Sequence, residues 1–172
     1  TYDKKGLVLH CGSFSKSLAP GYRIGWTAAG RYKNTVIQLK RMHNISTNTL
    51  AQVSIAHFLQ NGRYELHLRR LRKDLHTQSL RYLQAITEFF PEDIRITQPQ
   101  GGFVLWIEMK SGDGYNLHKR ARKHQIGIAP GQIFSAQGQY QNHFRLSYGL
   151  PWSDQIEKGL KTLGELMYKE MA

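Results

Sequence analysis

Residues 12–26 read GSFSKSLAPGYRIGW, and this stretch decides how the rest of the chain is interpreted. Two hydroxyl residues, Ser13 and Ser15, precede Lys16, and Arg23 follows seven residues later, beyond a Pro-Gly turn. Burial and nearby positive charge make a lysine amine nucleophilic near neutral pH. Hydroxyls and a guanidinium can together hold a phosphate. The residues alone leave two interpretations open: a covalent site for an aldehyde phosphate, or a surface turn with an ordinary lysine and arginine.

The composition is that of a globular protein, with 40% hydrophobic residues and 16 glycines in 172 residues. No apolar run approaches the roughly 20 residues that span a bilayer. The first residues also lack the apolar segment of a signal peptide. The single cysteine, Cys11, cannot form an intrachain disulfide, which suits a reducing compartment. We therefore expect a cytoplasmic protein that does not associate with a membrane.

The net charge of +12 raises a second hypothesis, a surface that binds nucleic acid. Lysines and arginines cluster at residues 69–73 and 119–123. Both clusters fall in stretches that are expected to be helical, and the apolar residues there occupy other angles of the helix. We therefore favour two solvated helix faces over a nucleic-acid interface in this part of the protein.

The hydrophobic pattern predicts two lobes joined by a long helix. Apolar residues recur at spacings of three and four over residues 63–90, and Pro91 ends that helix. In the first lobe we expect strands at residues 7–11, which would be buried, and 24–29, and helices at residues 34–42 and 49–59. In the second lobe we expect strands at residues 94–96, 103–108, 126–129 and 144–148, and helices at residues 116–124 and 154–171. The predicted fold class is thus an α/β segment followed by a small α+β domain with an antiparallel sheet covered by helices.

The stretch at residues 12–26 resembles the lysine segment of fold-type I pyridoxal-phosphate proteins, the aspartate aminotransferase superfamily. In the branch related to kynurenine and α-aminoadipate aminotransferases, the pattern is Ser-x-Ser-Lys followed by arginine seven residues later. The resemblance implies that Lys16 is the catalytic lysine, which binds pyridoxal 5′-phosphate covalently. It also implies that Ser13, Ser15 and Arg23 bind the cofactor phosphate.

A competing motif occupies the same residues. Ser13 to Lys16 also matches the S-x-x-K motif of penicillin-binding proteins, and Ser46-Thr47-Asn48 mimics their second motif. Their third motif, Lys-Thr-Gly, is not met, because residues 161–164 read KTLG and fall in a predicted helix. We therefore disfavour this alternative.

A second candidate site lies near the end of the chain, where residues 142–149 read NHFRLSYG. Alternation along a strand puts Phe144, Leu146 and Tyr148 on one face and Arg145 on the other. The spacing alone favours an exposed strand arginine. However, Arg-Leu-Ser followed by an aromatic residue resembles the strand whose arginine binds the substrate α-carboxylate in this superfamily. The resemblance implies that Arg145 is the substrate-binding residue, since a guanidinium can form two parallel hydrogen bonds with a carboxylate.

The resemblance extends from about residue 7 to residue 148, because residues 61–72 and 99–106 are similar to the interlobe helix and to the first hairpin of the small domain. It implies the C-terminal part of the fold-type I aminotransferase fold. Residues 1–62 would be the end of the large pyridoxal-phosphate-binding domain, and residues 63–172 the interlobe helix and the C-terminal small domain. In the family, other cofactor contacts lie upstream of the lysine and the site forms in a homodimer. We therefore expect this stretch alone to bind cofactor poorly and to be inactive.

Two functions of different classes follow. Residues 10–16 and 21–26, HCGSFSK and GYRIGW, look closer to the aminotransferase-like domain of MocR-type regulators of the GntR family. In such a regulator the cofactor and an amino acid are ligands that shift a conformational equilibrium, and DNA is bound only through an N-terminal domain outside these residues. The alternative is the C-terminal part of a cytoplasmic aminotransferase, in which the Lys16 amine moves a proton of the amino acid substrate. We favour the regulator.

Overall fold

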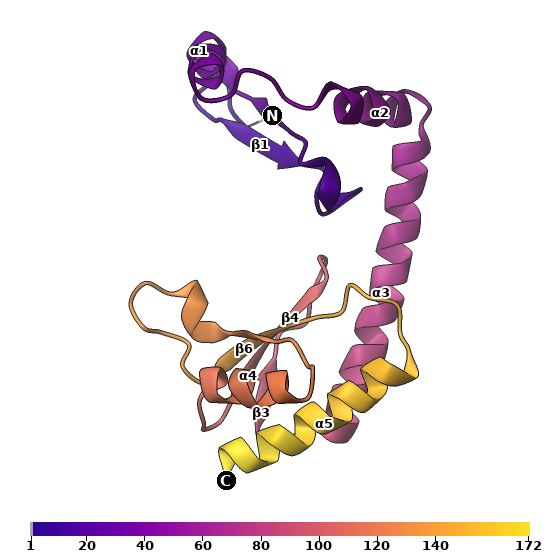
Figure 1. The fold of residues 1–172 in the computed structure, drawn as a ribbon, viewed down its shortest axis with the longest axis vertical. Coiled ribbons are helices and arrows are strands. Elements are labelled where there is room, and N and C mark those ends of the chain that lie inside the picture. The colour runs from indigo at the N-terminus through magenta and orange to yellow at the C-terminus, as the bar shows by residue number, and fades with distance from the viewer. Residues whose placement is uncertain (1) are drawn as a thin grey trace. The chain divides into compact units, whose positions relative to one another are not determined.

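The computed structural model describes residues 2–172, which divide into two compact units. The first unit ends at Arg69 and the second spans Arg70–Ala172. The division falls within the longest helix, α3 (Arg63–Phe89) (Figure 1). The domains expected from the sequence, 1–62 and 63–172, remain a prediction.

The first unit is built on a two-stranded antiparallel ribbon. Its elements are β1 (His10–Ser13), a 3-10 helix (Pro20–Tyr22), β2 (Gly25–Ala28), a second 3-10 helix (Gly30–Tyr32), α1 (Lys33–His43), α2 (Thr49–Gln60) and the first turns of α3. Helix α2 begins after Asn48, whose side chain accepts a hydrogen bond from the Ala51 amide at 3.2 Å. The small core consists of buried Ile24, Ala51 and Ile55, with Phe14 and Leu18 packed against it.

The strand predicted over residues 7–11 is wrong in both position and burial. Pairing with β2 begins only at His10, and Leu7, Val8 and Leu9 are each about half exposed. The cause is a local competition for backbone donors. The Asp3 carboxylate accepts hydrogen bonds from the amides of Leu7 and Val8 at 3.1 and 2.9 Å, so these amides bond a side chain and not a neighbouring strand.

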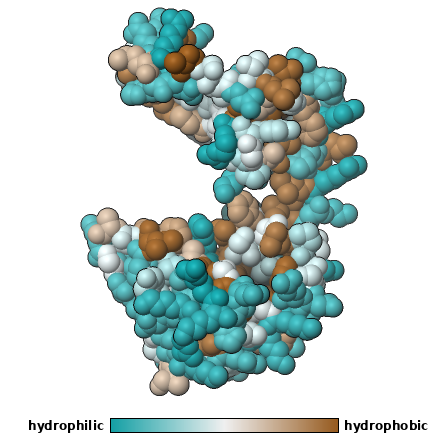
Figure 2. Space-filling model, viewed as in Figure 1, coloured by the Kyte–Doolittle hydropathy of each residue, from teal (hydrophilic) through white to brown (hydrophobic). Residues whose placement is uncertain are grey.

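The second unit contains a four-stranded antiparallel sheet in the order β3-β4-β6-β5. Its elements are the rest of α3, β3 (Ile94–Ile96), β4 (Val104–Met109), α4 (Gly114–Lys123), β5 (Ala129–Pro130), a 3-10 helix, η3 (Gly131–Phe134), β6 (His143–Ser147) and α5 (Asp154–Met171). The outer surface of this unit is mostly hydrophilic on the face that Figure 2 draws.

Alternation along the two central strands decides which face of this sheet is covered. Leu105 and Ile107 of β4 and Phe144 and Leu146 of β6 are buried in one core together with side chains of α3, α4 and α5. The helices therefore cover one face (Figure 1), and the face predicted for β6 is confirmed. The opposite face of the sheet carries the exposed side chain of Arg145, the predicted carboxylate ligand.

Helices α3 and α5 approach closely at Gly164. A Cβ atom on this residue would lie 2.1 Å from the backbone carbonyl oxygen of Phe89, which is far inside van der Waals contact. Gly159, on the same helix, has no neighbour closer than 4.0 Å, the side chain of Ile126. The first glycine is therefore required for packing, whereas the second is not.

The predicted helix over residues 116–124 begins two residues earlier than expected. Asp113 caps it, because its carboxylate accepts hydrogen bonds from the amides of Tyr115 and Asn116 at 2.7 and 2.9 Å. A carboxylate at the N-terminus also interacts favourably with the helix dipole.

The strand predicted over residues 126–129 is shorter, because only Ala129 and Pro130 pair with β6. The preceding residues bond to α4. The Ile126 amide donates to the Ala121 carbonyl at 3.0 Å, and the Nδ1 atom of His118 donates to the Ile128 carbonyl at 2.7 Å. Among residues 2–172, no helix has both the length and the apolar character needed to cross a membrane.

Candidate functional site

The turn between β1 and β2 joins all three predicted phosphate ligands in one chain of hydrogen bonds. The Ser15 amide donates to Ser13 Oγ at 3.2 Å, and Arg23 Nη1 donates to Ser15 Oγ at 3.1 Å. The Arg23 backbone adopts the left-handed conformation with φ of 53°, and its amide donates to the Pro20 carbonyl at 3.3 Å. This local turn brings the guanidinium back to the two hydroxyls.

The strands that flank this turn depend on a glycine. Gly12 lies opposite Trp26 in the β1–β2 register, and a Cβ on Gly12 would come within 2.4 Å of the indole ring. The indole also stacks on the His10 ring at 5.1 Å between centroids. Any larger residue at position 12 would displace the indole from the ribbon.

We call residues 13–19 the lysine turn, and backbone bonds hold it to the core of the first unit. The Phe14 amide donates to the Ile24 carbonyl at 3.1 Å, and the Phe14 carbonyl accepts from the amides of Leu18 and Ala19 at 2.9 and 3.1 Å. Ile24 is only 7% exposed, so one end of the turn is fixed to buried structure.

Helix α3 adds two contacts that sequence reasoning had not assigned to the site. The hydroxyls of Tyr64 and Ser17 lie 2.8 Å apart, and His67 Nε2 donates to the Ser17 carbonyl at 2.8 Å. Tyr64 and His67 are three residues apart on the helix, so both side chains reach the same residue. This spacing was the available signal. The two side chains form a clamp on the residue that follows Lys16.

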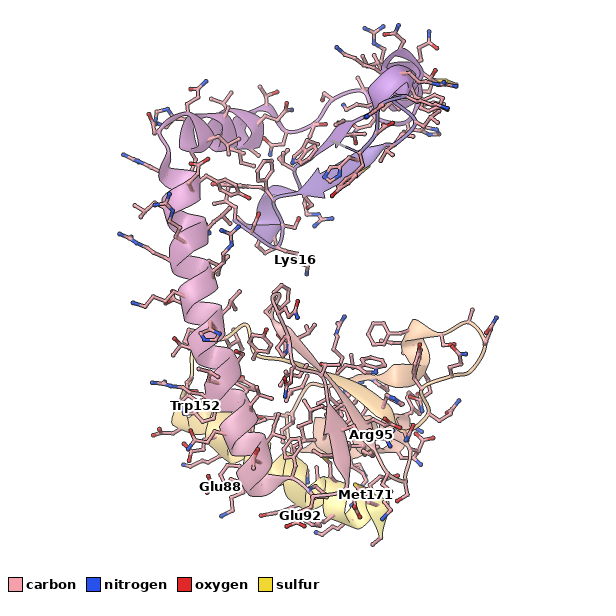
Figure 3. All side chains as sticks on the ribbon, turned by 180° about the vertical axis from the view of Figure 1, so that it is seen from behind. Lys16, Glu88, Glu92, Arg95, Trp152 and Met171 are labelled. Carbon is pink, nitrogen blue, oxygen red and sulfur yellow. The ribbon has the colours of Figure 1, made fainter. Side chains whose placement is uncertain are left out.

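Lys16 itself is exposed on the lysine turn (Figure 3). Its amine is carried by the same short segment as the two serine hydroxyls, and the Arg23 guanidinium bonds one of these. A primary amine beside a set of phosphate donors can form a covalent bond with an aldehyde that also carries a phosphate.

Arg145, the predicted carboxylate ligand, lies in the second unit. It is exposed on the open face of β6, directly opposite Trp106 of β4. Its guanidinium carbon lies 4.8 Å from the centroid of the Phe134 ring. Sequence reasoning gave Phe134 and Trp106 no role near this arginine.

Four rings surround this part of the open face, and we call Trp106, Phe134, Tyr140 and His143 the aromatic cluster. The indole of Trp106 contacts Phe134, Tyr140 and His143 at centroid distances of 5.4, 5.4 and 5.5 Å. Tyr140 and His143 are 5.3 Å apart. The cluster lies within the second unit and forms from β4, η3, β6 and the segment before β6.

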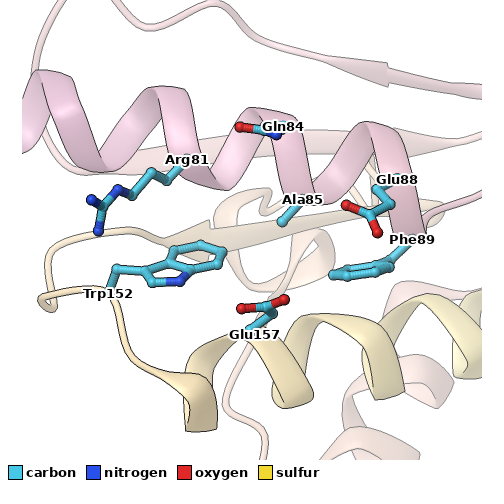
Figure 4. A pocket seen from close by; sticks show the side chains of 7 residues that line it. All are labelled: Arg81, Gln84, Ala85, Glu88, Phe89, Trp152 and Glu157. Carbon is cyan, nitrogen blue, oxygen red and sulfur yellow. The ribbon is translucent and has the colours of Figure 1, made fainter.

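A separate pocket of about 210 Å³ lies between α3 and the start of α5 (Figure 4). Its lining residues are Arg81, Gln84, Ala85, Glu88, Phe89, Trp152 and Glu157. It contains none of the predicted site residues. Within the described residues there is also no group of three His, Cys, Asp or Glu side chains that could hold a metal ion.

Comparison with known proteins assigns the chain to a family. The model of the family "Aminotransferase class I and II" matches residues 1–163. The HTH-type transcriptional regulators YjiR and YdcR of Escherichia coli K12 are 39% and 36% identical to this chain. Each alignment covers 99% of the chain and, respectively, 37% and 36% of the regulator.

A solved structure gives the same fold. The kynurenine aminotransferase of Pyrococcus horikoshii superposes with a TM-score of 0.90 at 32% identity, over 99% of this chain and 43% of the enzyme. The prediction of a partial fold-type I aminotransferase fold is thereby confirmed. The chain spans less than half the length of these relatives. It belongs to the class I and II aminotransferase family, whose fold-type I members use pyridoxal 5′-phosphate.

Proposed function

We propose that this chain is the pyridoxal-phosphate-binding, aminotransferase-like part of a GntR/MocR-type transcriptional regulator that senses the cofactor and an amino acid. The observation that carries the proposal is the identity of 36–39% to two HTH-type regulators over 99% of the chain. The kynurenine aminotransferase is similar over the same length but less identical, at 32%.

The residues of the lysine turn fit the cofactor. Its phosphate is a dianion that needs several donors, and Ser13 and Ser15 supply hydroxyls beside the Arg23 guanidinium. Its aldehyde needs a primary amine, which the exposed side chain of Lys16 can supply. When bound, pyridoxal phosphate supplies an electron sink for chemistry at the α-carbon of an amino acid.

Each residue has a distinct role in this proposal. Arg23 and the two serines hold the phosphate, and Lys16 is the covalent attachment point. Tyr64 and His67 orient the lysine turn through Ser17. Arg145 binds the carboxylate of the amino acid through two parallel hydrogen bonds.

The complete protein would have further parts and partners. We propose that it is a homodimer in the bacterial cytoplasm and that an N-terminal helix-turn-helix domain, outside these residues, contacts DNA. The domain boundary predicted at residues 62–63 would separate the end of the large domain from the interlobe helix. An amino acid that binds at Arg145 would then change the population of DNA-binding conformations.

A covalent label tests the cofactor site. The complete polypeptide is mixed with pyridoxal phosphate, reduced with borohydride and mapped by peptide mass spectrometry. We expect the mass addition on the peptide that contains Lys16, its loss in Lys16→Ala, and its retention in the control Lys5→Ala. Label that persists in Lys16→Ala at another lysine would contradict the assignment.

The alternative, a cytoplasmic aminotransferase, is favoured by the TM-score of 0.90 to an enzyme. Two assays on the complete polypeptide separate the functions. Specific binding to DNA from its own promoter region supports the regulator. Multiple turnover of an amino acid and a keto acid, without specific DNA binding, would replace it with the enzyme.

A further inference from the structure

The guanidinium of Arg145 is supported on one side by an aromatic ring. Its carbon atom lies 4.8 Å from the centroid of Phe134, within the range of a cation–π interaction. The Arg145 side chain is exposed on the open face of β6, where a long flexible side chain would otherwise sample many rotamers. Stacking on a ring restricts that freedom.

Phe134 is itself held in place. Its ring meets the indole of Trp106 edge-on at 5.4 Å, and Trp106 is the cross-strand neighbour of Arg145. The η3 segment that carries Phe134 is anchored by Gln132, whose amide donates to Asp113 Oδ1 at 3.2 Å and to the Gln141 carbonyl at 3.0 Å. The Phe134 ring that contacts the guanidinium is therefore held by Trp106 and by the hydrogen bonds of Gln132.

The polar edge of the guanidinium has no acidic partner within residues 2–172. The one carboxylate on the same face of β4, Glu108, forms its ion pair with Arg95 at 3.6 Å. A ring that stacks on the guanidinium covers its flat face and leaves the N–H groups at its edge available. This is the geometry that a planar carboxylate needs for two parallel hydrogen bonds.

We propose that Phe134 is a positioning residue for Arg145: with Trp106 behind it, the ring orients the guanidinium so that its edge receives the carboxylate of an amino acid ligand. The inference rests on the proposed role of Arg145. It adds a determinant of selectivity, because Phe134 favours ligands with a carboxylate over amines of the same shape.

The test compares two ligands that differ only in the carboxylate. In the cofactor-loaded complete protein, the twenty standard L-amino acids are screened by the change in cofactor absorbance. The tightest-binding amino acid and the amine that lacks its α-carboxylate are then titrated into wild type, Phe134→Leu, Phe134→Tyr and Arg145→Gln. Leucine keeps an apolar side chain but has no aromatic face.

We expect Phe134→Leu to weaken amino acid binding about two- to fivefold and to leave amine binding unchanged. Phe134→Tyr should restore wild-type affinity. If Phe134→Leu weakens both ligands equally, or neither, while Arg145→Gln removes the preference for the amino acid, the positioning role is wrong and the proposed function stands. If Arg145→Gln keeps that preference, the carboxylate site and this inference both fail.

Discussion

The clamp on the lysine turn should contribute measurable local stability. Tyr64→Phe removes the hydroxyl that lies 2.8 Å from Ser17 Oγ, but keeps the ring that contacts Phe14 and Phe58 at 5.8 and 6.4 Å. A hydrogen bond between neutral, partly buried groups contributes about 1 kcal/mol. Ser17→Ala removes the other partner of the same bond. Each variant should therefore lower the local stability of the lysine turn by about 1 kcal/mol. The double variant should lower it by about the same amount and not by twice as much.

Amide hydrogen exchange measures this loss of stability within the lysine turn. The amides of Leu18 and Ala19 both donate to the Phe14 carbonyl, so they exchange when the turn opens. A loss of about 1 kcal/mol corresponds to roughly fivefold faster exchange. Tyr32→Phe is the control, because the Tyr32 hydroxyl makes no hydrogen bond within residues 2–172 and its loss should change exchange little.

Two results would contradict a stabilising hydrogen bond between Tyr64 and Ser17. Exchange at Leu18 and Ala19 in Tyr64→Phe that matches wild type would mean that the hydroxyl contact contributes nothing. Fully additive effects of Tyr64→Phe and Ser17→Ala would mean that each residue acts separately and that no shared hydrogen bond couples α3 to the lysine turn.

Three further predictions concern the second unit. Gly164→Ala should lower the free energy of unfolding by about 2 kcal/mol, because the clash with the Phe89 carbonyl outweighs the higher helix propensity of alanine. Gly159→Ala should raise it by up to about 1 kcal/mol. Thermal unfolding of both variants tests this, and equal shifts of the midpoint would contradict close packing at Gly164. Asp113→Ala removes the cap of α4 and should lower the free energy of unfolding in urea by about 1 kcal/mol. An unchanged free energy would mean that the cap does not stabilise the protein. Burial raises the pKa of Tyr82 and Tyr148 above the usual 10, so the folded state favours the neutral phenols. Stability should then be full below pH 10 and fall as pH rises through the raised pKa values, and Tyr148→Phe should make this fall shallower.

The long helices were predictable from the sequence because their signals are local. The apolar spacing over α3 is a local signal. So is Ser153 before α5, whose hydroxyl accepts a hydrogen bond from the Ile156 amide at 3.4 Å. The structure places both helices within one residue of the prediction. Strict alternation predicted β6, and short apolar runs on either side of the turn at residues 99–102 predicted β3 and β4. These signals do not depend on which other segment packs against them.

The errors arise where backbone amides or carbonyls of a predicted strand form hydrogen bonds outside the sheet. The apolar run over residues 7–11 has the composition of a buried strand, but the amides of Leu7 and Val8 donate hydrogen bonds to the Asp3 carboxylate. The strand over residues 126–129 is shortened by bonds to α4, including the one from His118. Strand patterns do not record such bonds, because the partner is chosen by the tertiary fold.

The candidate site was only partly accessible from the sequence. Ser13, Ser15, Lys16 and Arg23 lie within one stretch of the sequence, so a motif could identify them, although their roles remain proposals. The aromatic cluster could not be identified this way. Phe134 reaches Arg145 through the 3-10 helix after β5, and no sequence period connects the two residues.

The proposal that this chain senses the cofactor and an amino acid for a regulator is tested most directly by the affinity of the complete polypeptide for its own promoter DNA. This affinity is measured with pyridoxal phosphate, in the presence and absence of the best-binding amino acid. We predict that the amino acid changes the dissociation constant of the DNA complex for wild type and leaves it unchanged for Lys16→Ala. An amino acid effect that persists in Lys16→Ala, or specific DNA binding that no amino acid alters, would contradict it.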